Sequence, residues 1–205
     1  TCICMGARHA GAHGISRGLS LKGVKQKPVA VIGDSTFLHS GITGLIDMVY
    51  NGGDALVVIM NNDTTGMTGG QEHAGTGRTA SGAEAPKLDI GKLCQAIGAK
   101  RVREIDAYNL KELEGIMKEE LAAPGTSVLI SNQPCVLRYR VSHKPYRVDK
   151  ATCVGCKMCL KSGCIALSFG PGGKDNKGLA EVDALLCNGC GVCSQLCTTK
   201  SMVNT

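Results

Sequence analysis

Two cysteine-rich runs near the end of the chain constrain its fold more than any other feature. Three thiols at three-residue spacing on a short loop can bind one iron–sulfur cube, and in a domain with two such runs the trailing Cys of each run ligates the other cluster. The runs are Cys153-Val-Gly-Cys156-Lys-Met-Cys159 with trailing Cys164, and Cys187-Asn-Gly-Cys190-Gly-Val-Cys193 with trailing Cys197. The spacing therefore predicts one [4Fe–4S] cluster on Cys153, Cys156, Cys159 and Cys197, and a second on Cys187, Cys190, Cys193 and Cys164.

Zinc sites and a disulfide framework are the alternatives for these cysteines. Zinc usually takes two ligands from each C-x-x-C pair, whereas here each run offers three thiols, so the spacing favours clusters. The stretch resembles the bacterial two-cluster ferredoxins. It departs from them because Ile165 and Thr198 stand where that family has Pro, and because four residues separate Cys159 from Cys164. All eight ligands remain in place.

Composition bounds the size, compartment and partners of the protein. A chain of 205 residues has room for one medium-sized domain and a small one. Two clusters would lower the formal charge of +6 to roughly +2, and there is no long basic run, so we expect no nucleic-acid partner. No apolar run approaches ~18 residues, so we expect no membrane span. Clusters and free thiols indicate a reducing, cytoplasmic environment. We expect the four remaining cysteines to be buried thiols: Cys2, Cys4, Cys94 and Cys135.

Strand and helix patterns alternate through the first two thirds of the chain. Apolar β-branched runs predict strands at 28–33, 55–60 and 126–130, and 101–105 is another strand candidate. Apolar spacing predicts helices at 5–21, 40–50, 89–97 and 109–121, with a loop at 34–39. Asp89 can cap one helix, and Asn109 with Glu112 resembles a capping box. The alternation predicts an α/β domain, with a doubly wound, mostly parallel sheet, at 1–133. A connector at 134–145 and a small α+β cluster domain at 146–205 would follow.

Polar residues follow two neighbouring predicted strands. Gly33-Asp34-Ser35 ends one strand and Asn61-Asn62 ends the next, at the sheet edge where doubly wound folds bind ligands. Carboxylate and amide oxygens suit Mg²⁺, and backbone N–H groups after Asp34 could bind a diphosphate. Gly-Asp-Ser is also a common turn and Asn-Asn a common strand end, so the residues alone leave both interpretations open. A long Gly- and Thr-rich loop at 63–85 favours a functional role.

These segments carry a family resemblance. The stretch from Gly33-Asp34-Ser35 to Asn61-Asn62 is similar to the thiamine diphosphate motif, which begins Gly-Asp-Gly and ends Asn-Asn, with Ser35 as the departure. The segments at 37–41 and 68–73 resemble the 2-oxoacid:ferredoxin oxidoreductases. A cluster domain that follows the thiamine domain is similar to the indolepyruvate branch of that family.

The resemblance implies a set of site residues. Mg²⁺ would be held by Asp34, Asn62 and the backbone carbonyl of Thr64, and thiamine diphosphate by these and Gly33, Ser35, Gly66, Thr68 and Gly69. His39 and His73 are candidates for substrate or cofactor contacts, with a loop histidine bonded to backbone as the equal alternative. We expect His9 and His13 to be packing or surface residues.

The resemblance also implies an activity. Such an enzyme decarboxylates an aryl 2-oxoacid of the indolepyruvate type oxidatively to an acyl-CoA, and passes electrons through two [4Fe–4S] clusters to ferredoxin. Coenzyme A and a beta subunit would be its partners. The carboxylate that activates the aminopyrimidine would lie in a region preceding this chain, so we expect the chain to be N-terminally truncated and inactive alone. Two alternatives stay open: another 2-oxoacid such as pyruvate as substrate, or an electron-transfer module with an inactive α/β domain.

Overall fold

A computed structural model describes residues 4–139, 144–173 and 176–204. The chain divides into two compact units, Thr1–Tyr139 and Arg140–Thr205. Of the predicted connector, the residues up to Tyr139 therefore belong to the first unit.

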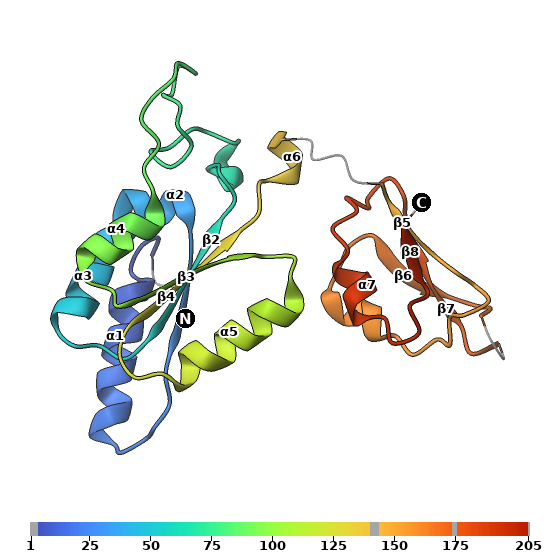
Figure 1. Ribbon diagram of the computed structural model, residues 1–205, viewed down its shortest axis with the longest axis horizontal. Helices are drawn as coiled ribbons and strands as arrows, with labels where there is room; N and C mark the ends of the chain where they lie inside the picture. The colour runs from blue at the N-terminus through green and yellow to red at the C-terminus, as the bar shows by residue number, and fades with distance from the viewer. Residues whose placement is uncertain (1–3, 140–143, 174–175, 205) are drawn as a thin grey trace. The chain divides into compact units, whose positions relative to one another are not determined.

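The first unit is built on four parallel strands in the order β1-β2-β4-β3 (Figure 1). The strands are β1 (Val29–Gly33), β2 (Leu56–Asn61), β3 (Arg101–Asp106) and β4 (Ser127–Asn132). The helices are α1 (Arg8–Leu21), α2 (Asp34–Thr36), α3 (Ile42–Tyr50), α4 (Ile90–Ile97), α5 (Leu110–Ala122) and α6 (Val136–Tyr139), with short helical turns η1 (Phe37–Gly41) and η2 (Gly66–Thr68). The predicted parallel α/β sheet is confirmed.

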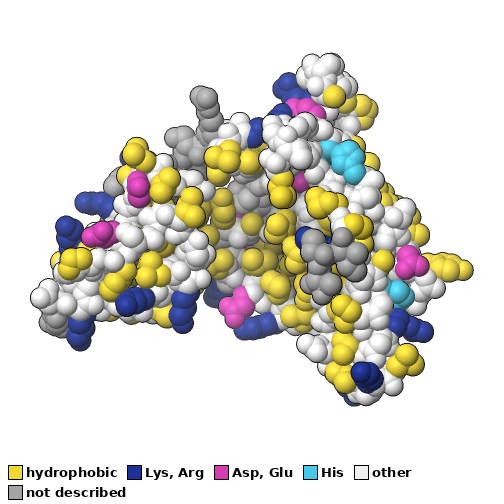
Figure 2. Space-filling view, turned by 180° about the vertical axis from the view of Figure 1, so that it is seen from behind, with side chains coloured by type: hydrophobic (Ala, Val, Ile, Leu, Met, Phe, Trp, Pro, Cys, Tyr) yellow, Lys and Arg dark blue, Asp and Glu magenta, His cyan; other side chains and the backbone are white. Residues whose placement is uncertain are grey.

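Helices cover both faces of this sheet. On one face, buried side chains of β1, β2 and β4 pack with residues of α1, α3 and α4, among them Leu45, Met48 and Cys94. On the other face, Leu56 and Leu129 pack against Ile116 of α5. Successive strand residues point to opposite faces, so β2, β3 and β4 supply both cores, whereas β1 supplies the first and leaves Val29 and Val31 exposed on its other face. Figure 2, which shows the side opposite to Figure 1, has further hydrophobic side chains exposed on both units.

Two predicted helix caps are confirmed. The Asp89 carboxylate accepts a hydrogen bond from the Lys92 N–H at 2.9 Å, at the start of α4. The Asn109 carbonyl oxygen accepts one from the Glu112 N–H at 3.3 Å, and its amide donates to the Glu112 carboxylate at 2.7 Å. Each cap satisfies a backbone N–H that the helix itself leaves unpaired.

The predicted loop at 34–39 is wrong. Asp34 begins a helical segment that runs through α2, η1 and α3 without a break. Phe37 has no exposed surface and meets the ring of His9 edge-on, with ring centroids 5.9 Å apart. Burial of Phe37 against α1 is a tertiary contact that local spacing does not reveal. α1 also begins later than predicted, at Arg8 rather than Met5.

A buried polar network fixes the far end of the sheet. The side chain of Glu120 is fully buried and accepts hydrogen bonds from Arg101 at 2.7 and 2.9 Å. Lys27 donates to the backbone carbonyls of Glu120 and Ala123, both at 2.8 Å, and to the Ser127 hydroxyl at 3.1 Å. Lys27 thus satisfies carbonyls that the last turn of α5 leaves unpaired.

The second unit contains two pairs of antiparallel strands. β5 (Tyr146–Val148) pairs with β8 (Met202–Asn204), and β6 (Leu167–Gly170) with β7 (Leu179–Val182). The short helix η3 (Met158–Ser162) begins within the first cysteine run, and α7 (Val192–Leu196) begins within the second. The same order of elements therefore occurs twice along the chain: a strand, a cysteine run, a short helix and a second strand. Each copy contains one of the two cysteine runs.

Candidate functional site

Asp34 lies at the carboxyl end of β1, where the chain turns from strand to helix. Gly33 has an extended backbone and Asp34 is the first helical residue. Asp34 is 2% exposed. Its Oδ1 accepts the Ser35 N–H at 2.8 Å, and its Oδ2 accepts the Asn62 N–H at 3.1 Å. These donors hold the carboxylate at the junction of β1 and β2.

Asn62 and Thr64 complete this corner of the sheet. The Asn62 side-chain oxygen accepts the Thr64 N–H at 3.3 Å, and Thr64 is 2% exposed. A Cβ atom on Gly66 would come within 3.5 Å of the Asn62 amide nitrogen, so the loop passes close to that side chain. The structure thus brings Asp34, Ser35, Asn62 and Thr64 together, with Gly66 next to Asn62.

Thr68 and Gly69 lie further out in the same loop and are exposed. The Thr68 hydroxyl contacts the Gln71 side-chain oxygen at 2.7 Å, and the Gln71 amide donates back to the Thr68 carbonyl at 2.6 Å. Gly69 has a φ of 116°, in the left-handed region that glycine adopts most readily. The described contacts of Thr68 are within the loop, so cofactor contacts of this pair stay predictions.

The two histidines named from the sequence occupy different environments. His39 is exposed on η1. His73 is 6% exposed, its Nδ1 accepts the Gly75 N–H at 3.1 Å, and its Nε2 lies 3.3 Å from Asp34 Oδ2. Of the other two, His9 is fully buried against Phe37, where burial lowers its pKa.

Three buried polar atoms of the loop lack a hydrogen-bond partner among the described residues. They are Thr65 Oγ1, Glu72 Oε2 and His73 Nε2, the last because its approach to Asp34 is too oblique for a hydrogen bond. Buried polar atoms are nearly always paired. Orphaned atoms in one loop beside a buried carboxylate fit a site that receives a polar ligand, and the oxygen donors there suit Mg²⁺.

A contact between this loop and α6 was missed by the sequence reasoning. Arg138 of α6 forms an ion pair with Glu72, and the Tyr139 hydroxyl donates to the Asp63 carbonyl at 2.6 Å. These residues stand in the predicted connector, where no periodic pattern marks a helix. Their partners are more than sixty residues away in the sequence, so only the fold reveals the contact.

Asn61 and Asn132 bond across the same edge of the sheet. The two residues are paired in register on β2 and β4, and the Asn61 amide donates to the Asn132 oxygen at 2.8 Å. An open pocket of about 600 Å³ lies there, and Asn61, Asn132 and Lys87 contribute to its lining. The predicted cofactor residues do not line it.

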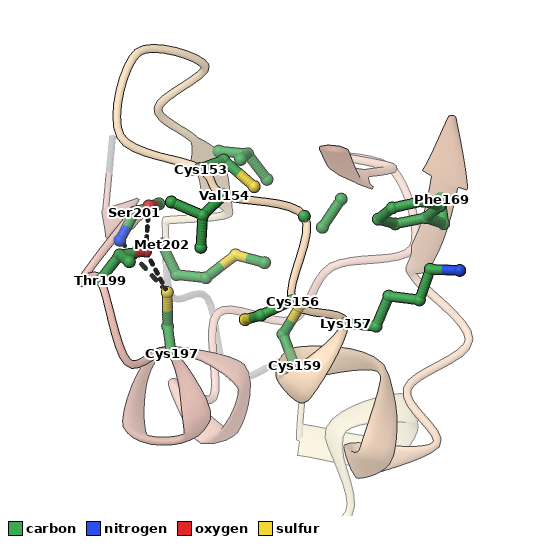
Figure 3. A pocket seen from close by; sticks show the side chains of 13 residues that line it. Cys153, Val154, Cys156, Lys157, Cys159, Phe169, Cys197, Thr199, Ser201 and Met202 are labelled. Atoms are coloured by element: carbon green, nitrogen blue, oxygen red, sulfur yellow. Dashed lines mark hydrogen bonds between the residues drawn. The ribbon is translucent and has the colours of Figure 1, made fainter. Parts of the chain in front are cut away.

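The eight cysteines of the two runs line two separate pockets in the second unit. One is lined by Cys153, Cys156, Cys159 and Cys197 (Figure 3), and the other by Cys164, Cys187, Cys190 and Cys193. We call these the Cys153 pocket and the Cys164 pocket. Each combines three thiols of one run with the trailing Cys of the other, which is the grouping that the spacing predicts. Four thiols around one pocket are the donor set of a [4Fe–4S] cluster.

The two runs share an unusual backbone. Gly155 and Gly189 have φ values of 66° and 72°, and Lys157 and Gly191, two residues later, have 61° and 77°. Left-handed residues at matching positions curl each run around its pocket. At Gly155 the backbone of the neighbouring loop also comes close, because a Cβ there would lie 2.6 Å from the Gly178 carbonyl oxygen.

The thiols differ in their electrostatic surroundings. Burial, with the neighbouring Cys190 and Cys187, raises the pKa of Cys193 to about 11. Burial alone would also raise the pKa of Cys197, but hydrogen bonds from Thr199 and from the backbone outweigh it and lower that pKa. In the part of the chain that the structure describes, no three His, Cys, Asp or Glu side chains converge as they would on a single metal ion.

The cysteines outside the two runs are only partly as predicted. Cys94 is fully buried, and burial raises its pKa to about 12. Cys135 is half-buried, whereas Cys4 is exposed, so the prediction for Cys4 is wrong. Cys2 lies outside the described residues. Within the described ranges, no helix is both long and apolar enough to span a membrane.

Known proteins match both units. Residues 1–131 match the thiamine pyrophosphate enzyme C-terminal TPP binding domain. Indolepyruvate oxidoreductase subunit IorA of Pyrococcus horikoshii is 37% identical over 96% of this chain and 32% of its own length, and the IorA subunit of Archaeoglobus fulgidus is 35% identical over 98% and 31%. The chain thus spans about a third of the length of these curated relatives.

A solved structure shares the fold of part of the chain. The 2-oxoglutarate:ferredoxin oxidoreductase of Magnetococcus marinus superposes with a TM-score of 0.55 and 19% identity, over 64% of this chain and 46% of that one. The chain is similar in sequence to IorA subunits over nearly all of its length. The family match over residues 1–131, together with the site at Asp34, shows that this chain belongs to the thiamine pyrophosphate enzymes and carries their C-terminal TPP-binding domain.

Proposed function

We propose that this chain is the part of a 2-oxoacid:ferredoxin oxidoreductase that binds thiamine diphosphate with Mg²⁺ and conducts electrons through two [4Fe–4S] clusters. The observation that supports this most is the union, in one chain, of a TPP-binding domain with two pockets that are each lined by four cysteines. A thiamine enzyme needs an electron outlet when its reaction is an oxidation, and iron–sulfur clusters provide one.

The first unit would hold the cofactor through its sheet edge. The Asp34 carboxylate, the Asn62 side-chain oxygen and the Thr64 carbonyl would bind Mg²⁺, with Ser35 and the loop at 66–73 around the diphosphate. Thiamine diphosphate, when bound, supplies the electron sink that decarboxylation of a 2-oxoacid requires. The ion pair of Glu72 with Arg138 would fix the loop against α6, which limits its motion over the site.

The substrate, product and partners rest on the relatives. The IorA proteins are named as subunits of indolepyruvate oxidoreductases, which supports an aryl 2-oxoacid as substrate and a beta subunit as partner. Coenzyme A as acyl acceptor, ferredoxin as electron acceptor and a cytoplasmic location belong to the same proposal. Assays of the complete complex, under anaerobic conditions and across a panel of 2-oxoacids, test it. Indolepyruvate should give the highest kcat/KM, and pyruvate as the preferred substrate would refute the assignment.

Cluster binding is tested by anaerobic reconstitution of the chain with iron and sulfide. We expect about eight iron and about eight sulfide ions per chain, four of each for every [4Fe–4S] cluster. A Cys193→Ser variant should lose about half of the iron, because it removes one of the four ligands of one cluster. Cys94→Ser should lose none, because Cys94 lines neither pocket. Full occupancy by zinc with no retained iron would contradict the proposal.

Thiamine diphosphate binding is tested by calorimetry with and without Mg²⁺. We expect Mg²⁺-dependent binding that Asp34→Asn abolishes, because that change removes the anionic ligand and keeps the side chain's shape. If the reconstituted chain binds clusters and the complete complex binds no thiamine diphosphate, the electron-transfer module with an inactive α/β domain becomes the better description.

A further inference from the structure

The two cysteine pockets differ in the hydrogen-bond donors that reach their sulfur atoms. In the Cys153 pocket, the Ser201 N–H donates to Cys197 Sγ at 3.2 Å, and the Thr199 hydroxyl lies 3.7 Å from the same sulfur (Figure 3). The Thr198 hydroxyl lies 3.9 Å from Cys156 Sγ. Thr198 occupies the position where two-cluster ferredoxins have Pro, so the departure from that family places a hydroxyl beside a ligand of the same pocket.

The hydroxyls act as donors once the thiols are deprotonated. A free thiol could donate to either threonine, but a thiolate that ligates iron has no proton and can only accept. Ser201 is 1% exposed, and its hydroxyl is 2.6 Å from that of Thr199. When the Ser201 hydroxyl donates to Thr199, the Thr199 hydrogen is directed to Cys197 Sγ, and each bond of such a chain strengthens the next.

The Cys164 pocket has a different lining. The backbone N–H of Tyr146 donates to Cys187 Sγ at 3.4 Å, and the described lining includes no Ser or Thr. The pockets are otherwise alike. Each encloses about 320 Å³ including its opening, and each has one exposed thiol, Cys156 or Cys164, and one buried thiol, Cys159 or Cys193. Size and exposure therefore do not separate the two pockets, whereas the aliphatic hydroxyls do.

We propose that Thr198, Thr199 and Ser201 raise the reduction potential of the cluster in the Cys153 pocket above that of the cluster in the Cys164 pocket. Hydrogen bonds to cluster sulfurs stabilise the reduced state, which carries one more negative charge. An electron shared by the two clusters then resides mainly in the Cys153 pocket. This inference rests on the proposed cluster binding, and the three residues are positioning residues that act through the ligating sulfurs.

A redox titration of the reconstituted chain, followed by electron paramagnetic resonance, tests the proposal. The wild-type chain should show two distinct potentials. Thr199→Val should lower the higher potential by about 59 mV, which is a tenfold change in the equilibrium of a one-electron reduction. The lower potential should stay unchanged. Thr198→Val and Ser201→Ala should shift the higher potential in the same direction, and Thr199→Ser, which keeps the hydroxyl, should restore it.

Thr152→Val is the matched control. Thr152 precedes Cys153, but its hydroxyl bonds to the Asp149 carboxylate at 2.9 Å, so the same chemical change beside a ligand should move neither potential. Equal wild-type potentials, or a Thr199→Val variant with full iron content and unchanged potentials, would overturn the inference while cluster binding stands. Absence of any cluster signal would overturn both.

Discussion

His73 Nε2 lies 3.3 Å from Asp34 Oδ2, and both side chains are almost completely buried. The Gly75 N–H donates to His73 Nδ1, so in the neutral ring the proton resides on Nε2, the atom that faces Asp34. The imidazole therefore borders the carboxylate that we propose as a Mg²⁺ ligand, beside the same oxygen, Oδ2, that accepts the Asn62 N–H. Groups that border a ligand in this way orient it.

Removal of His73 should weaken Mg²⁺-dependent thiamine diphosphate binding without abolishing it. Loss of such an outer partner typically costs about 10–100-fold in affinity, so we expect His73→Ala to raise the calorimetric Kd within that range. His39→Ala is the control, because His39 is exposed, and its Kd should match the wild type. Equal effects of the two substitutions would rule out a specific role for His73.

Gly155→Ala should impair cluster assembly, whereas Gly163→Ala should be far milder. Both glycines have a φ of 66°, so the backbone penalty for alanine is the same. They differ in space: a Cβ on Gly155 would lie 2.6 Å from the Gly178 carbonyl, whereas nothing lies within 4 Å at Gly163. Iron content after reconstitution measures the difference. Indistinguishable iron contents would show that the neighbouring backbone yields without cost.

Glu120→Gln should destabilise the first unit in a pH-dependent manner. Hydrogen bonding to Arg101, the largest influence on this carboxylate, lowers the pKa of Glu120 below its ordinary value of 4.5. Because the folded-state pKa is depressed, the stabilisation that the Glu120 carboxylate provides is complete above the unfolded-state pKa. It is lost as the pH falls through the folded-state pKa. We expect a loss of about 2 kcal/mol at pH 7, typical of hydrogen bonds to charged groups.

Urea unfolding at pH 7 and at pH 3.5 measures this effect. The difference between wild type and Glu120→Gln should shrink at the lower pH, because the unfolded wild-type chain then binds a proton at Glu120 that the folded chain, with its lowered pKa, binds less readily. Glu114→Gln is the control, because Glu114 is exposed and its ion pair is with Lys118 on the same helix. A difference for Glu120→Gln that stays constant between the two pH values would contradict the assigned pKa shift.

Lys27→Met should also destabilise the first unit. Lys27 is 5% exposed at its side chain and donates to two carbonyls at the end of α5 and to Ser127. Methionine keeps much of the aliphatic volume but leaves those acceptors unpaired, which typically costs about 1–3 kcal/mol. Thermal unfolding of the Lys27→Met variant should show a lower Tm. Lys25→Met is the control, because Lys25 is exposed, and its Tm should equal that of the wild type.

Local patterns predicted the sheet well, because β1, β2 and β4 are short, mostly apolar runs bounded by glycine or polar residues. The caps at Asp89 and Asn109 were predictable for the same reason, since capping depends on neighbours three residues away. The helical segment after Asp34 was not, because the burial of Phe37 against α1 decides it.

In the candidate site, too, some contacts were predictable from sequence patterns and others were not. Cysteine spacing predicted which four thiols line each pocket, and strand ends predicted that Asp34 and Asn62 meet. Two other contacts depend on how the loop folds back onto the sheet: the ion pair of Arg138 with Glu72 and the approach of His73 to Asp34. No local sequence pattern predicts that path of the loop. The hydroxyls after Cys197 were visible in the sequence as a missing proline, but only the structure directs them to sulfur.

Asn61 and Asn62 are chemically identical neighbours that the register of β2 assigns to different tasks. Asn61 is bonded sideways to Asn132, and Asn62 faces Asp34 and Thr64. A slip of β2 by one residue would exchange them, so strand alignment, more than residue identity, decides which amide would meet the proposed Mg²⁺. A paired aspartate scan of the two positions would therefore measure the registration of the sheet through the affinity for a divalent cation.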